Sequence, residues 1–75
     1  METKRYILVM EKTETGYSAF SPDVLDCESA TGDTEEQTRE KFMAALKLHL
    51  DGLRKVGAPL PEPNCTFAYV EVPTP

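Results

Sequence analysis

Hydrophobic positions along this chain form short runs of β-forming residues separated by turn signals. Residues 5–11 predict a first strand. The positions between Arg5 and Glu11 are all apolar, so both faces of this strand are apolar. Residues 12–16 end in Gly16 and have the composition of a hairpin loop, so residues 17–21 become the second strand. Pro22 and Asp23 end that strand, and residues 27–31 predict a short third strand.

A helix is the clearest local prediction. Thr34 is followed three residues later by Gln37, the spacing of a capping box, and Glu35 and Glu36 suit the positive end of a helix dipole. Gly57 is a C-terminal stop signal, so the helix should span residues 35–56. One stripe at helical spacing should face the core, and it consists of Phe42, Ala45, Leu46, His49, Leu50, Leu53 and Val56.

The segment after the helix predicts a connector and a last strand. Residues 58–63 contain three prolines and favour a stiff extended conformation, and residues 66–72 are again β-forming. The predicted fold class is therefore α+β, a β-β-β-α-β two-layer domain. It has a four-stranded, mostly antiparallel sheet with the helix on one face. A right-handed crossover would place the last strand parallel to the first and beside it.

The predicted sheet has more apolar surface than one helix can cover. In the first and last strands both sets of alternating side chains are apolar, yet only one set can meet the helix. Large contiguous apolar patches are rare on monomers, so we expect a homo-oligomer, a dimer or a tetramer. The aromatic residues expected in its interface are Tyr6, Phe20, Phe67 and Tyr69.

Length and charge narrow the class of protein. With 75 residues, the chain is predicted to be one domain over residues 1–75, and a formal net charge of -5 disfavours direct binding to nucleic acid. An acidic surface suits a basic partner. Two cysteines make no disulfide framework, and no leader or membrane-spanning segment is apparent. We therefore expect a soluble cytoplasmic protein with reduced thiols.

The order of several motifs resembles the HicB family of antitoxins. The residues that carry the resemblance are 14–20 (ETGYSAF), 21–27 (SPDVLDC), 30–36 (ATGDTEE) and 46–50 (LKLHL). The resemblance implies a fold like a truncated RNase H sheet and a cytoplasmic, oligomeric bacterial or archaeal protein. It also implies a partner: family members bind and neutralise HicA, a small basic toxin that cleaves mRNA.

Three departures from the family pattern limit what the resemblance implies. Leu25 and Asp26 stand where Pro-Gly is common, and Gln37 and Thr38 stand where an alanine often follows the paired glutamates. Many relatives also carry a C-terminal helix-turn-helix or ribbon-helix-helix segment that binds operator DNA. No such segment follows residue 72 here, so a C-terminal DNA-binding domain and autorepression are not expected.

Enzymatic readings of the same residues are weaker. An RNase H-like nuclease needs several carboxylates around Mg²⁺, and Glu11 and Glu40 lack a third at the matching end of the last strand, since Glu71 lies toward its other end. We interpret both as solvated surface charges. His49 and Cys27 are expected to pack in the core or an interface rather than to catalyse. No catalytic residue, cofactor or metal ligand is predicted.

The leading functional hypothesis is therefore a HicB-like antitoxin that occludes a basic HicA-type toxin and performs no chemistry. Asp23, Asp26 and Glu28 gather on one connection and are expected to steer that partner. The alternative is an orphan oligomeric structural or adaptor protein without a toxin partner. A degenerate RNase H-like enzyme is a more remote possibility.

Overall fold

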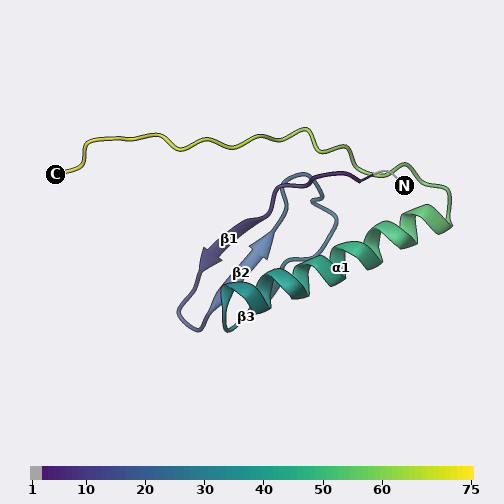
Figure 1. Ribbon diagram of the computed structural model, residues 1–75, viewed down its shortest axis with the longest axis horizontal. Coiled ribbons are helices and arrows are strands. Elements are labelled where there is room, and N and C mark those ends of the chain that lie inside the picture. Colours follow the sequence, from purple (N-terminus) through teal and green to yellow (C-terminus); the bar gives the residue numbers. More distant parts are fainter. Residues whose placement is uncertain (1–2) are drawn as a thin grey trace.

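A small antiparallel sheet carries one long helix, and an extended tail follows it. The structure, a computed structural model, describes residues 3–75 and contains β1 (Val9–Lys12), β2 (Tyr17–Phe20), β3 (Ala30–Gly32) and α1 (Glu35–Lys55) (Figure 1). The strands form a three-stranded sheet in the order β1-β2-β3, and both pairings are antiparallel. The single-domain prediction over residues 1–75 includes residues 1 and 2, which lie outside the described part.

A tight hairpin sets the register of the sheet. Lys12 lies opposite Tyr17, and the N–H of Thr13 donates to the carbonyl of Gly16 at 2.8 Å. A Cβ atom on Gly16 would clash with the carbonyl oxygen of Gly32, so only glycine fits where the hairpin approaches the end of β3. The hairpin was predicted at this position, but β1 begins four residues later than the predicted strand and β3 spans residues 30–32 instead of 27–31.

The core is small and lies between the sheet and the first half of the helix. Ala19, Val24, Cys27 and Phe42 are its buried hydrophobic residues. The partly buried hydrophobic residues packed against them are Tyr6, Leu8, Met10, Ala30 and Leu46. Val24 and Cys27 come from the β2–β3 connection, where the N–H of Cys27 donates to the carbonyl of Val24, so this loop fills one end of the core.

Both ends of α1 are capped as the sequence predicts. The N–H of Gln37 donates to the hydroxyl of Thr34 at 3.0 Å, while the Gln37 side chain accepts from the N–H of Asp33 at 2.7 Å. At the other end Gly57 has a φ of 73°, and the N–H of Ala58 donates to the carbonyl of Leu53. These are the bonds of a Schellman motif, and they stop the helix at the predicted glycine.

The apolar stripe of α1 is only partly used. Phe42 is buried, and Leu46, His49, Leu50 and Leu53 are half-buried. Ala45 and Val56 are exposed although both were predicted to face the core. Thr38, which the stripe did not include, is fully buried. Its hydroxyl donates to the carbonyl of Thr34, so burial does not leave the hydroxyl without a hydrogen bond. The C-terminal half of α1 extends beyond the short strands (Figure 1).

The prediction of a four-stranded β-β-β-α-β sheet is wrong for this chain. The element order is β-β-β-α, and residues 66–72 form no strand. Pro61 and Pro63 have no N–H to donate to a ladder. The N–H groups of Ile7 and Cys65 both donate to the Asp23 carboxylate, which takes the place of a direct backbone pairing between the two segments. The class remains a small α+β domain.

The tail gives the molecule an elongated shape. The radius of gyration is 14.5 Å, and the extents are 52 × 26 × 21 Å. A compact chain of this length would have a radius of gyration of about 11 Å. Figure 1 shows the cause, because the C-terminal segment runs past β1 and away from the sheet.

Within residues 3–75 no helix is long and apolar enough to cross a membrane.

Candidate functional site

The Asp23 carboxylate joins three segments that are distant in the sequence. One carboxylate oxygen, Oδ2, accepts the N–H of Ile7 at 2.9 Å, and the other, Oδ1, accepts the N–H of Cys65 at 2.9 Å. The position of Asp23 is fixed by the preceding turn, in which its own N–H donates to the Ser21 hydroxyl at 3.3 Å. Ser21 is buried, so the turn is anchored in the core. Asp23 therefore fastens the base of the tail to the sheet domain.

Two further contacts hold the tail at its base. The Tyr6 hydroxyl donates to the carbonyl of Pro61 at 2.8 Å. The Lys4 ammonium lies 3.2 Å from the Glu62 carboxylate, and such exposed ion pairs contribute at most about 1 kcal/mol. Figure 1 shows the start of the tail running beside the N-terminal segment in broadly the same direction, and residues 5–10 and 65–69 line a common groove. The two segments are thus neighbours without being paired strands.

The electrostatics of this junction follow from its hydrogen bonds. The N–H of Ile7 and then that of Cys65 lower the pKa of Asp23, because both bonds favour the carboxylate over the protonated acid. The hydrogen bond of the Cys65 side chain to Asp23 is the main cause that raises the pKa of the Cys65 thiol, with desolvation and the charge of Asp23 adding to it. Cys65 is exposed, and the raised pKa of its thiol disfavours the nucleophilic thiolate.

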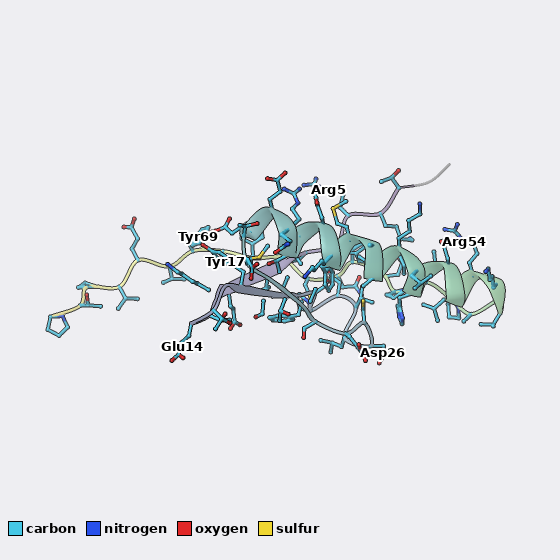
Figure 2. The ribbon with its side chains drawn as sticks, turned by 90° about the horizontal axis from the view of Figure 1, so that it is seen from below. Arg5, Glu14, Tyr17, Asp26, Arg54 and Tyr69 are labelled. Carbon is cyan, nitrogen blue, oxygen red and sulfur yellow. The ribbon has the colours of Figure 1, made fainter. Side chains whose placement is uncertain are left out.

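Asp26 and Glu28, the other two residues expected to steer a partner, lie on the β2–β3 connection and are both exposed. Figure 2 shows Asp26 and Glu14 pointing away from one side of the molecule, while Arg5 and Arg54 lie on the opposite side. Leu25, beside Asp26, is 79% exposed. The structure therefore separates the predicted trio, since Asp23 is occupied internally and Asp26 and Glu28 face solvent. Their role in binding stays a prediction.

The four aromatic residues predicted for an interface occupy different environments. Tyr6 and Phe20 are half-buried on the sheet domain, and strand alternation puts Phe20 on the face opposite Ala19, away from α1. Phe67 and Tyr69 lie on the tail with 74% and 93% of their surface exposed. Their rings contact each other edge to face with centroids 6.1 Å apart, so they share one side of the extended tail. The interface role of these residues stays a prediction.

The residues weighed for chemistry are dispersed. In the described part of the chain, no three His, Cys, Asp or Glu side chains are grouped so that they could hold a metal ion. Glu11 and Glu40 are exposed, as is Glu71 on the tail. Cys27 is buried, and burial is the main cause that raises the pKa of its thiol, followed by the charge of Glu28. His49 is half-buried on α1.

Comparison with known proteins gives one relative without a described role. The chain is 32% identical over 68 residues to an uncharacterized 14.9 kDa protein in the rep-hol intergenic region of Haemophilus phage HP1 (strain HP1c1). The match covers 91% of this chain and 50% of the phage protein, so the chain spans about half the length of that relative. No protein-family model matches the chain. No solved structure matches it significantly.

The junction at Asp23 was missed by sequence reasoning. Asp beside Pro commonly caps its own turn, and nothing in the local pattern indicates that this carboxylate reaches Ile7 and Cys65. One signal was present in the sequence. The connector that was predicted to be stiff brings the tail back toward the first strand, where its N–H groups need acceptors.

Proposed function

We propose that this chain is a HicB-like antitoxin domain that binds a small basic HicA-type toxin in the cytoplasm and blocks it by covering its surface. The resemblance in residues 14–36 carries the proposal, and these residues form the continuous path from the β1–β2 hairpin through β3 to the start of α1. No reaction of the chain's own is needed for this role, because occlusion requires only a complementary surface.

The charge distribution supports a basic partner. The formal net charge is -5, and exposed Asp26 and Glu28 lie beside the 79% exposed Leu25 on the same connection. Acidic residues around an exposed apolar side chain suit a protein partner, because charge accelerates association while apolar contact prolongs the complex. Asp23 contributes to this surface indirectly, since it holds the connection in place.

Co-expression tests the proposal. The coding sequence adjacent to this one is searched for a small basic protein, which is then expressed with and without this chain. The account predicts that the basic protein arrests growth alone, that this chain restores growth, and that the two proteins co-purify. If no small basic protein is encoded nearby, or if this chain neither binds it nor restores growth, the proposal is wrong.

Charge reversal on the connection gives a sharper prediction. Replacing Asp26→Lys and Glu28→Lys together should slow association with the basic partner by at least about tenfold at low salt and reduce its salt dependence. The matched control replaces Glu36→Lys and Glu40→Lys on the exposed face of α1, which changes the formal charge equally. Stopped-flow or surface-binding kinetics measure both. Equal slowing by the two variants would mean that net charge, rather than this surface, steers the partner.

An orphan oligomeric adaptor is the second candidate. The observation that favours it is the exposed apolar tail, which needs a protein surface but does not require that surface to belong to a toxin. The growth experiment separates the two candidate functions. An antitoxin restores growth that its neighbouring gene product arrests, whereas an adaptor forms oligomers without affecting any neighbouring gene product.

A further inference from the structure

Residues 66–72 have the composition of a strand and no partner strand in their own chain. The large apolar side chains of this segment are all exposed: Phe67 is 74%, Tyr69 93%, Val70 81% and Val72 68% exposed. Among the hydrogen bonds within residues 3–75 that join the tail to the sheet domain, the one at Cys65 lies furthest along the tail. An extended segment that is apolar on both faces, with backbone N–H and C=O groups outside any ladder, is the kind of segment that adds to a sheet edge.

An open sheet edge lies close to this tail. β1 pairs only with β2 in the strand order β1-β2-β3, so its outer edge has no partner in the described chain. A groove of about 790 Å³ runs along that edge, lined by residues 5–10 on one side and residues 65–69 on the other. Within the described residues the tail does not close this groove: Asp23 binds Ile7 and Cys65 at its base, but residues 66–72 form no ladder with β1.

We propose that residues 66–72 of one copy add as an antiparallel strand to the outer edge of β1 in a second copy, and that the exchange is reciprocal. Within one chain the tail runs in broadly the same direction as the N-terminal segment and β1 (Figure 1). A two-fold axis perpendicular to the sheet reverses that direction, so the tail of the partner copy meets β1 antiparallel, which is the more stable pairing.

The chemistry of the two segments favours a second copy over another occupant. Residues 66–72 carry a single charge, Glu71, and residues 5–10 carry a single charge of opposite sign, Arg5. Both segments are otherwise largely apolar, so each exchanged strand would cover apolar side chains of the tail and of the first strand together. Each pairing would supply hydrogen-bond partners to the outer edge of β1 and to the tail at once. A reciprocal exchange would form two such pairings in each dimer. This inference does not depend on the antitoxin role.

Proline substitution in the tail provides the first test. Ala68→Pro removes one N–H from the middle of the proposed strand, whereas Ala68→Val keeps it and favours strand conformation. Light scattering on the full chain should give a dimer mass for the wild type and for Ala68→Val, and a monomer mass for Ala68→Pro. Circular dichroism should show that helix content is unchanged in all three proteins. A monomeric wild type at about 100 μM, or a dimeric Ala68→Pro, overturns the proposal.

Disulfide trapping identifies the edge that receives the strand. In a Cys65→Ser background, Val9→Cys is combined in turn with a cysteine replacing each of residues 67–71, and the proteins are run without reductant after mild oxidation. Alternate strand residues point to opposite faces, so covalent dimers should form at positions of one parity and be at least fivefold weaker at the other. Covalent monomers would mean that the tail closes on its own chain. No cross-link at any position would place the dimer contact elsewhere, and either result overturns the proposal.

Discussion

Gly16 and Gly52 form a natural pair for testing how the hairpin packs. A Cβ on Gly16 would clash with the Gly32 carbonyl oxygen, whereas a Cβ on Gly52 would meet nothing within 4 Å. Gly16→Ala should therefore destabilise the fold by about 1–3 kcal/mol, because the backbone must move. Gly52→Ala should stabilise it by about 0.5–1 kcal/mol through helix propensity. Urea unfolding measures both, and similar effects at the two positions would contradict the described hairpin packing.

Asp23 should make the anchoring of the tail sensitive to acid. Its pKa is lowered in the fold, so its stabilising contribution is complete above the unfolded pKa of about 3.9 and is lost as the pH falls through the lower native value. NMR of the Ile7 and Cys65 amides should show both titrating together at that lower pH. Asp23→Asn should abolish this acid transition. Separate titration of the two amides would show that no single carboxylate joins them.

Among the elements, the helix was predictable because its determinants are local. Thr34, Gln37 and Gly57 fix the ends of α1 within a few residues of themselves, and the structure confirms both caps. Strand pairing depends on distant partners. The apolar pattern of residues 66–72 indicated a strand, but a strand also needs a partner in register, and the periodicity of one segment does not describe its partner. The hairpin was predictable for the same reason as the helix, because the residues that determine it are local.

Thr34→Ala tests the capping interaction at the element scale. Loss of the bond from the Gln37 N–H to the Thr34 hydroxyl should cost about 1 kcal/mol of unfolding free energy. Thr15→Ala is the matched control, because Thr15 is exposed in the hairpin turn and should change stability by less than about 0.5 kcal/mol. Chemical denaturation gives both values. An unchanged Thr34→Ala protein would mean that another group caps α1.

At the scale of the whole molecule, the sheet domain and the tail present surfaces of different chemistry. The sheet domain presents exposed Asp26 and Glu28, which a basic partner would recognise, while the tail presents apolar side chains that suit another strand edge. The two surfaces are separate on the chain, so the proposed binding of a basic partner and the proposed self-association should be separable by mutation. Asp26→Lys with Glu28→Lys should leave the oligomeric state unchanged, and Ala68→Pro should leave the acidic connection unchanged. Light scattering and circular dichroism check this independence.

Amide hydrogen exchange of the wild-type chain tests most directly whether residues 66–72 complete the sheet of a second copy. Exchange is measured by NMR or mass spectrometry at protein concentrations from about 1 μM to about 1 mM, which spans association in the micromolar range. The account predicts that the amides of residues 67–71 become protected as concentration rises, with the same midpoint as the increase in mass by light scattering, while the amides of α1 stay protected throughout. Exchange of residues 67–71 at unstructured rates at every concentration would contradict it.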